Sequence, residues 1–312
     1  MKFSTFERWF PSATGLCDIR YRMWVPEAPH IAMQITHGMA EHIDRYDEFA
    51  SFLAENGILV YGNDIVSHGK SIAPGMPKGY FGEENGMNAI LQDMRTMRDL
   101  IKVDYSGIPF ILFGHSMGSF FARIYAGRNG EDFDAFIFSG TGGADPRLPI
   151  AKLIAKSEIR KTGGKLPSEM LFKLGFGAYN NAFKPNRTAN DWLSRDEAQV
   201  DAYNADENCG FPFTSSALYD LYMGVSEISS EKWAASVPKK PIYMYSGSMD
   251  PVGGMGKGVK QVLGWLKKTG HKVELKLYEG ARHEMHNEIN RDEVYRDVLS
   301  FVNTIEIAAE KK

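Results

Sequence analysis

The sequence predicts an α/β fold with a mostly parallel sheet, and three observations lead to this prediction. Short apolar runs alternate with segments of helical spacing along much of the 312-residue chain, as is typical of parallel strands joined by crossover helices. The apolar run at 109–113 stops at a glycine-flanked serine, Ser116, and helical spacing follows at once. Two later apolar runs lead into turns that carry Asp250 and His283.

Taken in order, the chain opens with two extended segments, 3–9 and 16–25, whose partly alternating aromatic and β-branched residues predict a hairpin. The mostly apolar run at 31–36 fits a strand buried on both faces. The same criteria predict the remaining core elements: strands 58–61, 109–113, 133–138, 241–246 and 273–277, and helices 44–53, 87–101, 117–130, 256–268 and 292–307.

The alternation of strands and helices breaks in the middle of the chain. Between 141 and about 236 there is no convincing buried strand, and we expect only short helical pieces. We interpret 141–235 as an insertion into one core formed by 1–140 and 236–312. The insertion is rich in aromatic residues: Phe172, Phe176, Tyr179, Phe183, Phe211, Phe213, Tyr219 and Tyr222.

Composition argues against several classes of protein. The formal net charge is −3 and no run of lysine or arginine occurs, so we expect no nucleic-acid partner. The first residues have an early glutamate and no long apolar core, and no stretch of about 18 apolar residues occurs anywhere. Two cysteines far apart fit a reducing compartment. We therefore expect a soluble, cytoplasmic protein without integral membrane association, whose oligomeric state the sequence leaves open.

Residues 114–118 have the form G-x-S-x-G. Where a strand turns sharply into a helix, flanking glycines remove side chains that would collide, and the central serine is held in strained backbone geometry. An ordinary Gly/Ser-rich turn is the alternative. The strand, turn and helix context favours Ser116 as an exposed nucleophile at a helix N-terminus, where developing negative charge is stabilised.

A serine nucleophile needs a base, and the base needs an acid that orients it. Asp250 and His283 follow strands 241–246 and 273–277, and the carboxyl ends of parallel strands meet at one edge of the sheet. Each residue alone is weak evidence, because an aspartate in such a turn is more often a cap. Ser116, Asp250 and His283 in that chain order predict a catalytic triad. His286, three residues later, is the alternative base.

The developing oxyanion requires backbone donors. We expect these to be the N–H of Met117 and that of Met39 in the loop after strand 31–36. Gly38 would let this loop approach the substrate closely, and His115 beside the nucleophile is the other predicted substrate contact. The histidines do not have the H-E-x-x-H spacing of a zinc site, so we expect no metal and no cofactor.

Five segments occur in order along the chain: residues 37–46, 68–71, 114–118, 247–252 and 280–284. Together they resemble the monoacylglycerol lipase and lysophospholipase branch of the α/β-hydrolase superfamily, which is also labelled serine aminopeptidase-like. The chain departs from this branch at Ser67, where a glycine is common.

This resemblance implies the α/β-hydrolase fold, with an eight-stranded, mostly parallel sheet, flanking helices and a helical cap at 141–235. It also implies hydrolysis of a carboxylic ester through an acyl-enzyme on Ser116, with His283 as base and then acid, and Asp250 orienting it. An apolar cap suits a monoacylglycerol, a lysophospholipid or a small acyl or aryl ester.

The sequence leaves several alternatives open. An aminopeptidase, an amidase or an acyltransferase would use the same residues, and a non-catalytic ligand-binding member of the fold is a further alternative. Acyl chain length, the alcohol moiety, the cap residues that line the pocket and transient contact with a membrane surface are not determined by these patterns.

Overall fold

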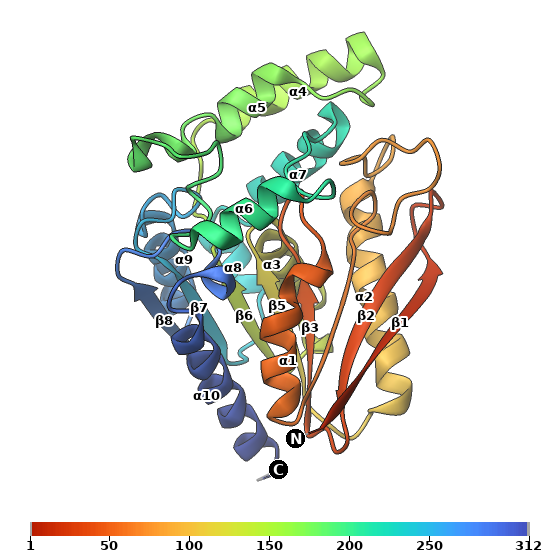
Figure 1. The fold of residues 1–312 in the computed structure, drawn as a ribbon, viewed down its shortest axis with the longest axis vertical. Helices are drawn as coiled ribbons and strands as arrows, with labels where there is room; N and C mark the ends of the chain where they lie inside the picture. The colour runs from red at the N-terminus through yellow and green to blue at the C-terminus, as the bar shows by residue number, and fades with distance from the viewer. Residues whose placement is uncertain (1, 311–312) are drawn as a thin grey trace.

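A computed structural model describes residues 2–310 and shows one eight-stranded sheet with helices on both faces (Figure 1). The strand order is β1-β2-β4-β3-β5-β6-β7-β8. Strand β2 pairs antiparallel with β1 and with β4, and the other pairings are parallel. The strands are β1 (Phe3–Pro11), β2 (Asp18–Pro26), β3 (Ile31–Thr36), β4 (Ile58–Asn63), β5 (Phe110–His115), β6 (Ala135–Ser139), β7 (Ile242–Gly247) and β8 (Val273–Tyr278). The predicted α/β-hydrolase fold is confirmed.

The central strands are buried on both faces because helices cover both sides of the sheet. Along β5, Phe110 and Leu112 pack with the helices of one side, whereas Ile111 and Phe113 pack with those of the other. Successive side chains point to opposite faces, so a strand covered on both sides is a continuous apolar run. That property is why the core strands could be recognised from sequence.

The core helices divide between the two faces of the sheet. Residues of α1 and α10 form the core of one face, and residues of α2, α3 and α9 form the core of the other. The core helical segments are η1 (Ile43–Tyr46), α1 (Asp47–Glu55), α2 (Gly86–Asp104), α3 (Met117–Asn129), η2 (Gly130–Asp132), α9 (Lys257–Lys268), η4 (Met285–Asn287) and α10 (Arg291–Glu310).

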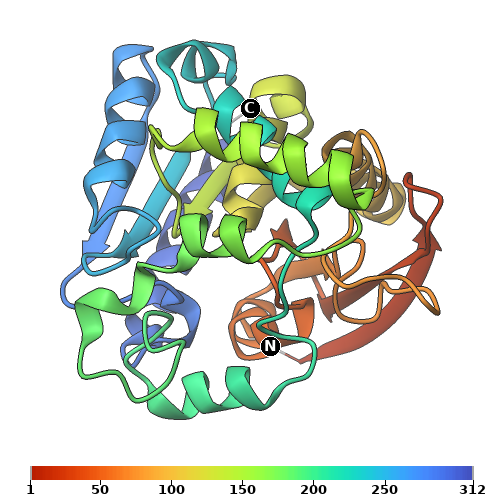
Figure 2. The same cartoon turned by 90° about the horizontal axis from the view of Figure 1, so that it is seen from above.

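The segment between β6 and β7 is helical and lies over one end of the sheet (Figure 1), where α4 and α5 cross above the core (Figure 2). Within it the structure shows no strand, only an isolated bridge between Pro167 and Thr214. Its helices are α4 (Leu148–Thr162), α5 (Glu169–Phe176), η3 (Tyr179–Phe183), α6 (Glu197–Ala205), α7 (Ser215–Glu227) and α8 (Glu231–Ser236).

Two of these helices are longer than the short pieces expected from sequence. Helix α4 begins with a proline in its first turn and ends at Gly163, which adopts a left-handed conformation. Proline and glycine therefore mark the ends of this helix rather than interrupting it. Helix α7 packs beside α4 and also contacts α2 and α3, whereas α8 packs against α3 and α9 of the core.

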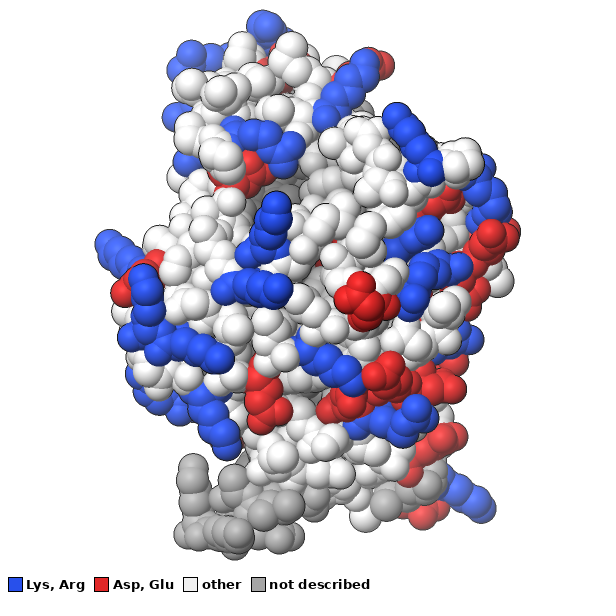
Figure 3. Space-filling model, turned by 90° about the vertical axis from the view of Figure 1, so that its left-hand side faces the viewer, with Lys and Arg blue, Asp and Glu red and all other residues white. Residues whose placement is uncertain are grey.

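The surface carries charges of both signs. On the face shown in Figure 3, lysine and arginine side chains are interspersed with aspartate and glutamate. Across residues 2–310, no helix combines the length and apolar character needed to span a bilayer.

The close approach of α3 to β3 yields a test of the fold. A side chain at Gly118 would collide with the backbone carbonyls of Thr36 and His37, which cannot move aside without shifting the strand. Gly118→Ala should therefore lower the free energy of unfolding by about 1–3 kcal/mol, as overpacking does. Gly264→Ala, on an exposed position of α9 with open space around it, is the matched control and should instead stabilise by up to about 1 kcal/mol. Urea unfolding measures the free energy of unfolding of both variants. Equal changes in the two variants would contradict the close packing of Gly118 against Thr36 and His37.

Candidate active site

Ser116 lies at the turn between β5 and α3. Its backbone has φ +53° and ψ −122°, a conformation that costs a non-glycine residue free energy and is characteristic of functional turns. Its N–H donates to the carbonyl of Ser139 at 3.0 Å. A side chain at Gly114 would collide with the carbonyl of Gly118, so both glycines of the segment are needed for the turn to form. Ser116 is half-buried rather than fully exposed.

Asp250 and His283 form a buried pair at the ends of the neighbouring strands β7 and β8. His283 Nδ1 lies 2.9 Å from Asp250 Oδ1. The carboxylate of Asp250 also accepts hydrogen bonds from the Ser246 hydroxyl at 2.8 Å and from the Val252 N–H at 2.9 Å. These bonds fix the orientation of the carboxylate, which in turn fixes the imidazole.

The carboxyl end of β6 lies between the serine and the histidine. Ser139 holds the backbone of Ser116, and the next residue, Gly140, adopts φ +58°. A Cβ at Gly140 would lie 3.0 Å from Cε1 of His283 and 3.1 Å from Cε1 of His115. The structure therefore brings the three predicted catalytic residues to one edge of the sheet, as the sequence predicted.

His283 differs electrostatically from the other buried histidines. Burial opposes its charged form, but the Asp250 carboxylate outweighs this effect and raises the pKa of His283. Burial lowers the pKa of His68 to about 4 and that of His286 to about 3, and it also lowers the pKa of His115 and of His37. Protonation near neutral pH is therefore favoured at His283 above these others.

His286, the alternative base, has a different environment. It is fully buried, and its ring stacks on Tyr46 at a centroid distance of 4.3 Å. Within residues 2–310, neither of its ring nitrogens has a hydrogen-bond partner. No carboxylate of the described residues is hydrogen-bonded to His286, so the geometry favours His283 as the base.

The loop after β3 passes alongside Ser116. A Cβ at Gly38 would lie 3.3 Å from Cβ of Ser116, and Met39 follows in the same turn. Met117 is the first residue of α3, where a backbone N–H has no acceptor inside the helix. Its amide and that of Met39 are thus on segments that adjoin the serine. His115, a predicted substrate contact, is buried with its ring 4.7 Å from that of His283.

A buried ionic network supports this loop, and the sequence did not reveal its pairing. Glu41 accepts hydrogen bonds from the Gly38 N–H at 2.5 Å, from the Tyr46 hydroxyl at 2.8 Å and from Arg45 at 2.7 Å. Arg45 also donates two hydrogen bonds to Glu284, at 2.6 and 2.7 Å. Burial opposes the ionisation of Glu284, yet Arg45 lowers its pKa to about 2.

Because Glu284 directly follows His283 in the chain, Arg45 links the loop beside Ser116 to the loop that carries the histidine. Both acids and the arginine lie inside the segments noted in the sequence. Their pairing joins residues 239 positions apart, which no local pattern encodes.

The inserted segment contributes a residue beside the histidine. The Trp192 ring lies 5.1 Å from that of His283, and the Tyr179 ring lies 5.0 Å from that of Trp192. Phe176 and Phe172 continue this line of aromatic rings, each 5.6 Å from the previous one, and Phe172 is exposed on α5. Trp192 was not singled out in the sequence, because it lies on a loop without periodic spacing.

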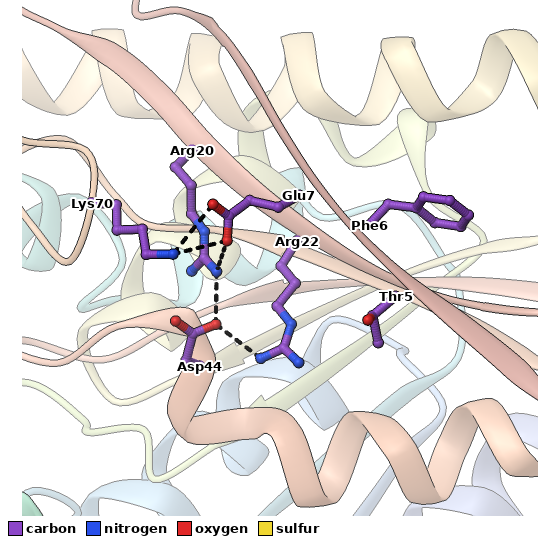
Figure 4. A pocket seen from close by; sticks show the side chains of 7 residues that line it. All are labelled: Thr5, Phe6, Glu7, Arg20, Arg22, Asp44 and Lys70. Atoms are coloured by element: carbon purple, nitrogen blue, oxygen red, sulfur yellow. Dashed lines mark hydrogen bonds and ion pairs between the residues drawn. The ribbon is translucent and has the colours of Figure 1, made fainter.

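A separate polar hollow lies near β1 and β2 (Figure 4), but its cations are already paired. Arg20 contacts Glu7 at 2.6 Å and Asp44 at 2.9 Å, and Arg22 contacts Asp44 at 3.0 Å. Paired guanidinium groups have little capacity left for an external anion. These ion pairs instead hold Asp44 and thereby the short helix η1, which follows the loop that carries Glu41. Its lining residues are Thr5, Phe6, Glu7, Arg20, Arg22, Asp44 and Lys70.

Comparison with known proteins identifies the family to which this chain belongs. Residues 27–290 match the family model described as "Serine aminopeptidase, S33". The chain belongs to the serine aminopeptidase S33 family. The resemblance found in the sequence is thereby confirmed.

Two relatives of this S33 chain are similar to it over most of their own length. A monoacylglycerol lipase of Mycolicibacterium smegmatis is 27% identical over 93% of this chain and 95% of its own. The human monoglyceride lipase is 28% identical over 90% of this chain and 84% of its own. Among solved structures, a carboxyl esterase from Bacillus coagulans has a TM-score of 0.92 and 32% identity, covering 98% of this chain and 100% of its own. The chain is therefore an esterase- or lipase-type member of the α/β-hydrolases.

The departure at Ser67 has a structural counterpart in this S33 member. Ser67 adopts φ +66°, a left-handed conformation in which glycine is favoured. Its hydroxyl accepts a hydrogen bond from the Tyr80 N–H at 2.8 Å. The serine side chain thus contributes a contact that glycine would lack.

The contrast between two histidines only three residues apart can be measured directly. In a titration followed by NMR of histidine side chains, His283 should remain protonated to a pH above the ordinary value of about 6.5. His286 should remain neutral across the same range, because burial lowers its pKa. His283→Gln and His286→Gln assign the resonances. Identical titration of the two imidazoles would contradict the opposite directions of their pKa shifts.

Proposed function

We propose that this protein is a serine esterase that cleaves carboxylic esters through an acyl-enzyme on Ser116. The observation that carries the proposal is the strained Ser116 turn at the same sheet edge as the buried Asp250–His283 pair. A strained serine, a histidine of raised pKa and a carboxylate held by its own hydrogen bonds are the components that nucleophilic catalysis requires.

In the proposed mechanism, the Ser116 hydroxyl attacks the ester carbonyl while Nε2 of His283 takes its proton. Asp250 holds the Nδ1–H of His283, which selects the tautomer with Nε2 free and stabilises the imidazolium. The backbone N–H groups of Met39 and Met117 stabilise the oxyanion. His283 then donates its proton to the departing alcohol, and water, activated by the same histidine, releases the acid and restores Ser116.

We propose that residues 141–235 form a cap over this site and that the substrate is a monoacylglycerol. Trp192 of this segment lies beside His283, and a line of aromatic rings leads from it to the exposed Phe172. Such a lining suits an acyl chain, which is held by apolar contact with few polar anchors. Relatives named monoacylglycerol lipase or monoglyceride lipase align along most of the chain and support this choice. A lysophospholipid or a small acyl or aryl ester would use the same contacts.

An aminopeptidase activity would need an acid to bind the free amino group of a peptide. Two buried acids beside the loop at Ser116 are Glu41 and Glu284, and Arg45 already pairs with both of them. This pairing favours a neutral ester over a charged peptide terminus. The acyltransferase alternative differs only in the acceptor, an alcohol in place of water.

Replacing the nucleophile tests the proposed reaction. Ser116→Ala should lower kcat at least about 10⁴-fold, because the acyl-enzyme cannot form, while the thermal unfolding midpoint changes little. The assay uses p-nitrophenyl esters and monoacylglycerols of increasing acyl length, and the proposal predicts that kcat/KM rises with chain length. Ser226→Ala, on α7, is the matched control and should keep full activity. Retained activity in Ser116→Ala would exclude this mechanism.

The pH dependence of the reaction follows from the histidine. Because only the neutral imidazole accepts a proton, kcat/KM should fall as pH drops through the pKa of His283 in the free enzyme. Asp250 raises that pKa, so the acid limb should lie above about 6.5. Asp250→Asn should move the limb to lower pH and reduce kcat by about 10⁴-fold. An acid limb at the same pH in both proteins would contradict the assigned pairing.

A further inference from the structure

Three side chains capable of binding a metal meet where the inserted segment touches the loop after β3. His42 belongs to that loop, whereas Asp206 ends α6 and Cys209 lies in the next turn. One donor atom of each residue lies within 4.8 Å of the other two. No local spacing in the sequence indicates this cluster, because His42 and Asp206 are 164 residues apart.

Backbone contacts hold these side chains in place. The Cys209 N–H donates to the carbonyl of Asp206 at 3.0 Å, which brings the thiol back toward the carboxylate. The carbonyl of Ala40 accepts hydrogen bonds from the Gly210 N–H at 2.9 Å and from the Tyr203 hydroxyl at 3.2 Å. The turn that bears Asp206 and Cys209 is therefore docked on the loop that bears His42.

We propose that His42, Asp206 and Cys209 form a binding site for a divalent transition-metal ion, with zinc as the best match. An imidazole nitrogen, a carboxylate oxygen and a thiolate sulfur are all ligands of Zn²⁺, whereas Mg²⁺ and Ca²⁺ prefer sites made of oxygen alone. Zinc–ligand bonds of about 2.0–2.3 Å place the ligands of a tetrahedron about 3.5 Å apart. The ligand atoms of the cluster lie within 4.8 Å of one another, so binding would draw them closer by about 1 Å, and water would supply the fourth ligand.

The surroundings fit this role. His42 Nε2 lies 2.8 Å from Asp206 Oδ2, which directs this nitrogen into the cluster, and His42 Nδ1 faces Asp44 at 4.0 Å. A carboxylate near the second nitrogen is the usual support for a metal-bound histidine. The nearby guanidinium of Arg45 is neutralised by its pairing with two glutamates. The Asp206 side chain is 31% exposed, so an ion can enter from solvent.

Binding must displace a proton from the cysteine. A cysteine binds a metal as its thiolate, so a neutral Cys209 thiol must lose its proton before it can become a ligand. Formation of the metal–sulfur bond then releases one H⁺ to solvent, and the thiolate and the Asp206 carboxylate together balance the charge of the ion. Affinity should therefore increase as pH rises.

The bound ion would join the inserted segment to the loop that runs beside Ser116. His42 follows Glu41, whose carboxylate holds the Gly38 N–H. A ligand that binds the folded state alone stabilises it by mass action, so saturating zinc should raise the thermal unfolding midpoint. The site does not depend on the proposed esterase activity, and its test uses binding rather than turnover.

Cobalt and zinc titrations of the metal-free full-length protein test the site. Co²⁺ should produce a thiolate-to-cobalt charge-transfer band that saturates at one ion per chain. Competition with a chromophoric chelator then gives the zinc affinity. Cys209→Ser should abolish the band and weaken zinc binding at least about 10-fold, the lower end of what even an outer-shell change costs. Asp206→Asn should weaken zinc binding by a similar factor.

Cys17→Ser is the matched control, because Cys17 is also a partly buried free thiol but donates to the carbonyl of Ser71, away from the cluster. It should keep both the band and the affinity. Absence of a thiolate band in the wild-type protein would overturn the proposal whether or not any variant folds. Loss of the band in Cys17→Ser, or unchanged zinc affinity in a folded Cys209→Ser, would also overturn it.

Discussion

The carboxylate of Asp250 is fully buried, and the architecture of the site follows from the need to compensate that charge. An unpaired buried carboxylate costs several kcal/mol. Here Ser246, Val252 and His283 together supply its hydrogen bonds. Those partners come from the ends of β7 and β8, which pair in parallel along their full length. The sheet topology thus brings hydrogen-bond partners to the Asp250 carboxylate. That carboxylate raises the pKa of His283, whereas burial lowers the pKa of His37, His68, His115 and His286.

A second buried charge connects this pair to the rest of the site. Arg45 bridges Glu41, which holds the amide of Gly38, and Glu284, which follows His283. The same loop contacts the inserted segment through the carbonyl of Ala40. The loop beside the serine is therefore held by the core on one side and by the insertion on the other.

The sequence predicted those parts of the molecule that local chemistry determines. Two glycines around Ser116 identify the turn because any side chain there would collide with backbone, and Asp250 and His283 could be placed because parallel strands end at one edge. The pairing of Arg45 with Glu284 and the contact of Trp192 with His283 depend on tertiary folding and leave no periodic signal. For residues 141–235 the sequence predicted only short helical pieces, whereas two helices of this segment, α4 and α7, are longer.

Peptide mapping after reaction with a fluorophosphonate shows which residue is the nucleophile. Mass spectrometry should find one phosphonyl group on the peptide that contains Ser116, and fragmentation should place it there rather than on Ser119, whose hydroxyl donates to the carbonyl of Ser116. Asp250→Asn should label much more slowly, because its histidine is no longer held in the required tautomer. No adduct, or an adduct on another residue, would show that Ser116 is not the nucleophile.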